Sequence, residues 1–179
     1  TISVSAFLLN RSSNLRLFAL AWWHTLGQAS GDQFGGQTRH YAWDEGECPI
    51  CRAKAKVDAG FEIMQKLGIK YFCFHDVDLI EEGATIEEYE ERMKIITDYL
   101  KEKMAGTDIK LLWGTANVFG HKRYMNGAAT NPDFEVVARS AVQIKNAIDA
   151  TIKLGGTNYV FWGGREGYSS LLNTQMQNR

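Results

Sequence analysis

The sequence lacks a charge excess, a long apolar run and a clear secretion signal. Its 179 residues include 20 Lys and Arg against 21 Asp and Glu, a formal net charge of −1. Because no basic surplus attracts phosphate groups, we expect neither nucleic acid nor a membrane as a partner. No apolar run reaches the roughly 18 residues of a membrane-spanning helix. Residues 1–9 are too short and too weakly basic for a convincing signal peptide. Because the chain has only three cysteines, we expect a cytoplasmic protein by default.

Cysteine is also scarce, and three residues are too few for a disulfide-stapled scaffold. Cys48 and Cys51 form a single Cys-x-x-Cys motif (CPIC). A structural zinc site would need a second pair of Cys or His residues at matching spacing, and none follows in the sequence. We therefore assign no function to this motif from the sequence. Cys73 lies within an apolar run, which predicts a packed core position.

The sequence does contain the composition of a globular domain, with 45% apolar and 23% charged residues. Short apolar runs rich in aromatic and branched side chains occur at residues 17–23, 69–75, 109–113 and 158–162. Most of them are nearly continuous rather than alternating. Such runs are typical of strands that are buried on both faces, as in a parallel sheet.

Segments with a helical spacing of apolar residues separate these strands, at residues 53–67, 86–100 and 137–152. Gly68 follows the first segment and predicts its C-terminal cap. Thr85 and Glu88 are spaced as a capping box before the second. Asn131 and Pro132 predict the cap and first residue of the third helix.

The predicted order is β-α-β-α-β-α-β within a single domain. Parallel strands need crossover connections, which are nearly always right-handed. An open doubly wound sheet and part of a (β/α)₈ barrel both fit this order. In both architectures ligands bind at the carboxyl ends of the strands, so candidate site residues are sought there.

The second predicted strand ends in His75, followed by Asp76, Val77 and Asp78. An imidazole titrates near neutral pH and can act as a general acid or base. A carboxylate on its other ring nitrogen would fix the tautomer, and Asp78 is within reach if the chain turns directly after the strand. The alternative is a buried histidine capped by an aspartate. The position at a strand end favours the functional interpretation.

Aromatic and polar residues follow the other strands. Trp23, Phe119 and Trp162 could form an apolar wall, because a flat indole packs well against the C–H face of a sugar ring. The alternative is that they are ordinary core residues. Thr115 and Asn117 offer a hydroxyl and an amide to a polyol.

Four stretches resemble xylose isomerase, most closely its longer class II type. They are residues 18–25 (FALAWWHT), 74–78 (FHDVD), 113–119 (WGTANVF) and 159–168 (YVFWGGREGY). The VFWGGREG stretch is a signature of that family. The resemblance runs in order over about residues 18–172, whereas residues 1–16 and 37–54, including CPIC, depart from the family pattern.

The resemblance implies a (β/α)₈ TIM barrel that interconverts D-xylose and D-xylulose, and also glucose and fructose, by a hydride shift between C1 and C2. Two divalent ions (Mg²⁺, Mn²⁺ or Co²⁺) hold the open-chain sugar in that family. By the same resemblance, His75 assists ring opening and Asp78 orients His75. The substrate-binding residues that it implies are Trp23, Thr115, Phe119 and Trp162.

The family's metal ligands lie in later strands, in a Glu-Pro-Lys-Pro stretch and further Glu, Asp and His residues, and this sequence has no such stretch. We therefore expect no metal ligand in this chain. We expect the amino-terminal half of such an enzyme, a single partial TIM-barrel domain over residues 1–179. Within it, residues 1–16 are a divergent segment and residues 17–172 form four βα units. We expect the chain to be inactive alone and the full-length enzyme to be a homotetramer.

Two other interpretations remain open. One is a non-catalytic carbohydrate-binding half-barrel that acts by pairing with itself or with another chain. The other is a different metal-dependent barrel enzyme, of a deoxyribose-phosphate or DNA-repair type. The near-neutral charge and the aromatic strand ends argue against the phosphate-rich ligands that this third class would bind.

Overall fold

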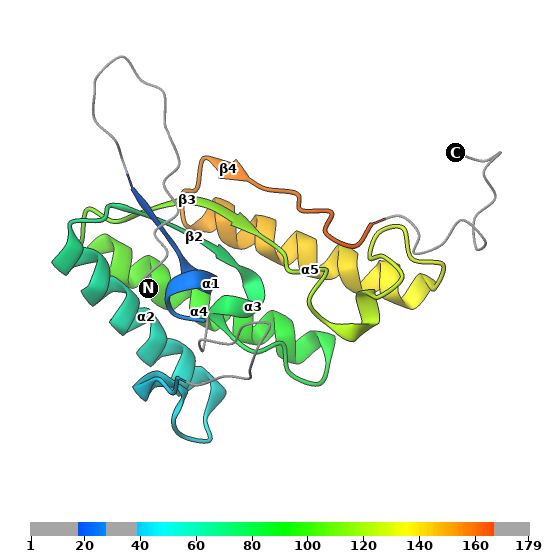
Figure 1. The fold of residues 1–179 in the computed structure, drawn as a ribbon, viewed down its shortest axis with the longest axis horizontal. Helices are drawn as coiled ribbons and strands as arrows, with labels where there is room; N and C mark the ends of the chain where they lie inside the picture. Colours follow the sequence, from blue (N-terminus) through cyan, green and yellow to red (C-terminus); the bar gives the residue numbers. More distant parts are fainter. Residues whose placement is uncertain (1–17, 28–38, 167–179) are drawn as a thin grey trace, which may run out of the picture.

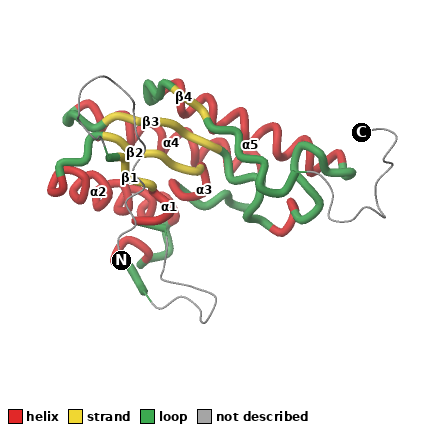
Figure 2. The backbone as a smooth tube through the Cα atoms, turned by 45° about the horizontal axis from the view of Figure 1, so that its top comes forward, coloured by secondary structure: helices red, strands yellow, loops and turns green. Residues whose placement is uncertain are grey.

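The sheet consists of four parallel strands that lie side by side in the order of the chain. The structure is a computed structural model and describes residues 18–27 and 39–166. The strands are β1 (Ala19–Ala21), β2 (Tyr71–His75), β3 (Lys110–Thr115) and β4 (Asn158–Tyr159). A doubly wound sheet reverses its strand order, whereas the unbroken order seen in Figure 2 is that of a barrel segment. The predicted α/β class, with part of a (β/α)₈ barrel, is thus confirmed.

Long helices connect the strands and cover one face of the sheet (Figures 1 and 2). They are α2 (Pro49–Leu67), α4 (Ile86–Ala105) and α5 (Phe134–Lys153). Two helix ends predicted from the sequence are confirmed: the C-terminal end of α2 and the N-terminal end of α4. Gly68 adopts a left-handed φ of 68° after α2, and the Thr85 side chain accepts the N–H of Glu88 at the start of α4.

Alternation along the strands divides their side chains between two faces. Phe72 and Phe74 belong to the main core cluster, together with apolar residues of α2 and α4. The intervening residue Cys73 pairs in register with Trp113, and His75 pairs with Thr115. His75 and Thr115 therefore lie next to each other on adjacent strands, on the sheet face opposite the helices.

Two strand boundaries were predicted wrongly. The first strand was expected to run to Trp23, but β1 ends at Ala21 and a short helix, α1 (Trp22–Thr25), follows. The fourth strand was expected to reach Trp162, but β4 ends at Tyr159. Apolar side chains after a strand gave the same sequence signal as the strand itself. The expected strand residue at position 17, the loop residue at 168 and the helix start at 171–173 lie outside the described residues.

The start and the buried face of α5 also differ from expectation. Its N-cap is Asp133, whose side chain accepts the N–H of Glu135, and Asn131 instead accepts the N–H of Asp133 at 2.9 Å. Ile152, expected in the apolar stripe, is 69% exposed. The face that packs inward carries small and polar residues, namely Ser140, Gln143, Ala147, Ala150 and Thr151. A close approach of α5 to β3 leaves no room for large side chains between them.

Shorter elements complete the description. They are α3 (Asp76–Leu79) and the 3₁₀ turns η1 (Ala42–Asp44) and η2 (Lys122–Tyr124). Within the described part of the chain, none of the helices has the length and apolar character needed to cross a membrane.

The close approach of α5 to β3 depends on Gly114, and this can be tested. A Cβ at position 114 would lie 2.2 Å from Oγ1 of Thr151 and 3.1 Å from Cζ of Phe74. Gly114→Ala is therefore expected to lower the free energy of unfolding by about 1–3 kcal/mol, measured by urea unfolding followed by circular dichroism. Gly106→Ala is the matched control, because its nearest contact would be Lys103 O at 3.9 Å. Equal effects of the two substitutions would contradict this packing.

Candidate functional site

The His75 and Asp78 side chains form a pair at the carboxyl end of β2. His75 ends the strand and serves as N-cap of α3, and the turn of α3 brings Asp78 back toward it. Oδ2 of Asp78 accepts the backbone N–H of His75 at 3.1 Å and lies 2.8 Å from Nδ1 of the imidazole. Because a carboxylate only accepts, the neutral form of this imidazole carries its proton on Nδ1 and its lone pair on Nε2. The two side chains are 13% and 14% exposed.

Aromatic rings surround this imidazole. The ring of Trp23, from α1, lies 4.4 Å from the His75 ring between centroids. Phe119, after β3, meets His75 edge-on at 5.6 Å. Trp162, after β4, contacts Phe119 at 6.5 Å and is 58% exposed. The structure thus brings residues from the ends of all four strands into one continuous set of contacts, with Trp162 at its edge.

Thr115 and Asn117 lie at the same end of the sheet, and the side-chain oxygen of each already makes a hydrogen bond. The Thr115 hydroxyl donates to Val160 O at 2.5 Å, and the residue is 1% exposed. Oδ1 of Asn117 accepts the N–H of Gly120 at 2.7 Å and so shapes the turn that carries Phe119.

A buried polar network behind the pair was not predicted. Asp76 is 0% exposed, and its Oδ1 accepts the N–H of Asn117 at 2.7 Å while its Oδ2 accepts the Tyr89 hydroxyl at 2.7 Å. Gln143 donates to Asn117 O at 3.2 Å and accepts from the Tyr124 hydroxyl at 2.7 Å. Burial raises the pKa of Asp76, against the effect of these hydrogen bonds. Asp76 thus joins the end of β2 to the end of β3. The only sequence signal was an Asp directly after the strand.

Glu166, in the Gly-Gly-Arg-Glu stretch, also has a role that the sequence did not reveal. Its carboxylate accepts the Thr130 hydroxyl at 2.7 Å and backbone N–H groups of residues 128–130. Burial acts to raise the pKa of Glu166, but these hydrogen bonds outweigh it and the pKa is lowered. Glu166 therefore fastens the loop after β4 to the loop before α5.

A polar hollow of about 430 Å³ lies between the segments that follow β2 and β3, and neither His75 nor Asp78 lines it. It is lined by Val77, Glu81, Glu82, Gly83, Asn117, His121 and Arg123. Glu82 forms ion pairs with Arg123 at 2.5 Å and Arg139 at 3.0 Å, which fix one wall. Burial, with the positive charge of Arg123, lowers the pKa of His121.

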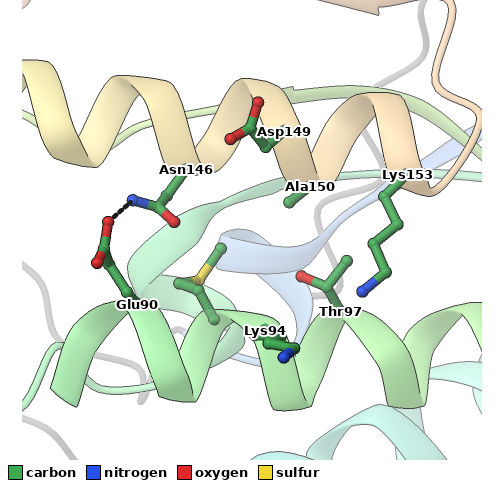
Figure 3. Close-up of a pocket in the computed structure, with 8 residues that line it drawn as sticks. Glu90, Lys94, Thr97, Asn146, Asp149, Ala150 and Lys153 are labelled. Atoms are coloured by element: carbon green, nitrogen blue, oxygen red, sulfur yellow. Dashed lines mark hydrogen bonds between the residues drawn. The ribbon is translucent and has the colours of Figure 1, made fainter. Parts of the chain in front are cut away.

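A second groove of about 290 Å³ lies between α4 and α5, where Asn146 donates to Glu90 (Figure 3). That groove holds none of the predicted site residues.

The described residues do not fit the two-metal centre that the resemblance implies. In residues 18–27 and 39–166, three or more His, Cys, Asp or Glu side chains nowhere gather closely enough to hold a metal ion. The carboxylates nearest the site are committed elsewhere, Asp78 to His75 and Glu82 to two arginines. No step of the chemistry is therefore assigned to a metal held by this part of the chain.

No protein-family model matches the chain. Curated proteins do match it: a xylose isomerase of Bacteroides thetaiotaomicron is 70% identical over 160 residues, and one of Phocaeicola vulgatus is 69% identical over 160 residues. A xylose isomerase of Xanthomonas oryzae pv. oryzae is 59% identical over 160 residues. Each match covers 89% of this chain and 36% of the relative. The resemblance to xylose isomerase indicated by four sequence motifs is thus confirmed, and the chain spans about a third of the length of the xylose isomerases that it matches.

Proposed function

We propose that the protein containing this chain is an aldose–ketose isomerase that interconverts D-xylose and D-xylulose, and also glucose and fructose. In this proposal the chain supplies the ring-opening pair and part of the sugar pocket. The observation that carries the proposal is the 2.8 Å contact of His75 Nδ1 with Asp78, enclosed by the rings of Trp23 and Phe119.

Ring opening needs a group that removes the proton of the anomeric hydroxyl and delivers a proton to the ring oxygen as the C–O bond breaks. His75 suits this task, because its Nε2 lone pair is free while Nδ1 is held by Asp78. The carboxylate of Asp78 orients the ring and stabilises the imidazolium that forms when Nε2 takes the proton. The 13% exposure of His75 limits access by water.

In this proposal the aromatic residues Trp23, Phe119 and Trp162 pack against the apolar face of the sugar. Trp23 and Phe119 both contact the imidazole, and Trp162 extends this wall through Phe119. Indole and phenyl rings pack against the C–H groups of a sugar and exclude water. A dry wall favours the transfer of hydride between C1 and C2 over the exchange of a proton with solvent. By the resemblance, Thr115 is proposed to bind a sugar hydroxyl, with its own hydrogen donated to Val160.

The remaining parts of the proposal concern the whole protein. We propose Mg²⁺, or Mn²⁺ or Co²⁺, as its cofactor and assign no residue of this chain as a ligand. A homotetramer in the cytoplasm is proposed on the same resemblance.

We expect no xylulose from the 179-residue chain with D-xylose and Mg²⁺. Turnover by that chain would contradict the proposal that the metal ligands lie outside it. A defined dimer with saturable sugar binding and no turnover would instead support the non-catalytic carbohydrate-binding half-barrel.

The ring-opening role is tested with His75→Gln in the whole protein. Turnover of cyclic D-xylose is expected to fall by about 10²–10⁴-fold, the usual worth of a positioned acid–base group. Turnover of glyceraldehyde should change far less, because an aldotriose is too short to close a sugar ring. The matched control is His40→Gln, an exposed histidine away from the strand ends. Equal losses on both substrates would remove the ring-opening role from His75.

A further inference from the structure

The CPIC motif has no part in the proposed sugar site, and its two cysteines are paired in the structure. Cys48 and Cys51 are joined by a disulfide, with their Cα atoms 5.2 Å apart, well inside the range that a disulfide spans. Both residues are exposed. The third cysteine, Cys73, differs in both respects. It is 1% exposed and unpaired, and burial raises the pKa of its thiol to about 12.

The two sulfur atoms do not occupy equivalent places. Cys48 is the N-cap of the 19-residue helix α2, and its Sγ accepts the backbone N–H of Cys51 at 3.2 Å. Pro49, at the first helical position, has no N–H to compete for this sulfur and fixes the turn. A backbone N–H and the positive end of a helix both stabilise a thiolate. Both features favour Cys48 over Cys51 as the attacking sulfur when the pair is reduced.

Contacts other than the disulfide hold this end of α2 in place. The Arg52 guanidinium binds Gly46 O on one side and the Glu81 carboxylate on the other. Lys56 donates to Asp78 O at 3.3 Å. The N-cap hydrogen bond to Cys48 needs only the sulfur atom and not the S–S bond. The helix can thus keep its start when the disulfide opens, so the pair can change oxidation state without unfolding its support.

We propose that Cys48 and Cys51 form a thiol–disulfide exchange site whose substrates are small disulfides and dithiols. In the oxidising direction the Cys48 thiolate attacks a disulfide RSSR, forms a mixed disulfide and releases one thiol RSH. Cys51 then attacks the Cys48 sulfur and releases the second RSH. The chain loses two hydrogen atoms and RSSR is reduced to two thiols. A dithiol runs the same steps in reverse, and none of them uses the proposed sugar site.

The test treats the native 179-residue chain with dithiothreitol or with oxidised glutathione and then counts free thiols by maleimide labelling and intact mass. After dithiothreitol, the native chain should take two labels, on Cys48 and Cys51. After oxidised glutathione it should take none, and the two states should interconvert with an unchanged circular dichroism spectrum. Cys73→Ser, the matched buried control, should retain the whole cycle.

Single variants test the order of attack. Cys51→Ser, which keeps Cys48, should react with Ellman's reagent about threefold faster than Cys48→Ser. A difference of about this size is expected because the greater thiolate fraction at a helix N-terminus outweighs the lower nucleophilicity of a stabilised thiolate. Each variant should stop at a glutathione mixed disulfide. The proposal is overturned if the native pair stays reduced in oxidised glutathione, or if maleimide labels it after dithiothreitol only when urea is present. It is also overturned if Cys48→Ser reacts with Ellman's reagent as fast as Cys51→Ser.

Discussion

Trp22→Ala is expected to lower the free energy of unfolding by about 3–5 kcal/mol, the usual cost of truncating a fully buried aromatic residue. The Trp22 ring is 0% exposed and packs 5.5 Å from the Phe72 ring of β2. On its other side, a Cβ at Gly60 of α2 would lie only 2.7 Å from Trp22 Cη2. Sheet and helix therefore fit closely around this indole, and its removal would leave a cavity between them. Native domains have only about 5–15 kcal/mol of stability, so this loss would be a large fraction of the total.

The neighbouring tryptophan provides the matched control. Trp23 is only partly buried and contacts His75 rather than the core. Trp23→Ala should cost about 1–2 kcal/mol, since less apolar surface is lost. Trp22→Phe should also cost less than Trp22→Ala, because Trp22 Nε1 is buried with no hydrogen-bond partner among the described residues. Urea unfolding followed by circular dichroism measures all three. Equal losses at positions 22 and 23 would contradict the core role of Trp22.

Asp76→Ala is expected to cost about 2–4 kcal/mol, because it leaves a buried donor without an acceptor. The N–H of Asn117 would lose its 2.7 Å partner. The Tyr89 hydroxyl retains a weaker acceptor, Gln143 O at 3.4 Å. Asp76→Asn should cost much less, because its amide oxygen can still accept the N–H of Asn117. Similar losses for the two variants would show that the hydrogen bond from Asn117 is not what Asp76 contributes.

The pH dependence of stability tests the same residue independently. Burial raises the pKa of Asp76 in the folded chain above its unfolded value near 4. The folded state then holds the Asp76 proton more tightly, so stability is greatest below the unfolded pKa. It should fall as pH rises from about 4 toward the folded pKa, by up to about 1.4 kcal/mol per pH unit. The difference in unfolding free energy between the native chain and Asp76→Asn isolates this effect. A difference that stays constant with pH would contradict it.

Local signals in the sequence determined much of this protein. Continuous apolar runs predicted four parallel strands, because a strand covered on both faces needs apolar side chains throughout. Gly68 and Thr85 marked helix ends, since each acts through its own backbone or its nearest turn. The contact of His75 with Asp78 was also within reach of the sequence, because one short helical turn joins residues three apart.

Tertiary structure decided what depends on distant partners. The α5 stripe has the expected helical period, but its phase is set by the approach to β3 at Gly114, which leaves Ile152 exposed. Parallel register places Thr115 beside His75 and brings Phe119 to its ring, although about 40 residues separate them along the chain. The burial of Asp76 also follows from packing, because its partners Tyr89 and Asn117 lie on other elements. A sequence specifies which side chains are present at each strand end, but only the assembled sheet and helices specify which of them touch, because each contact depends on the positions of several elements at once.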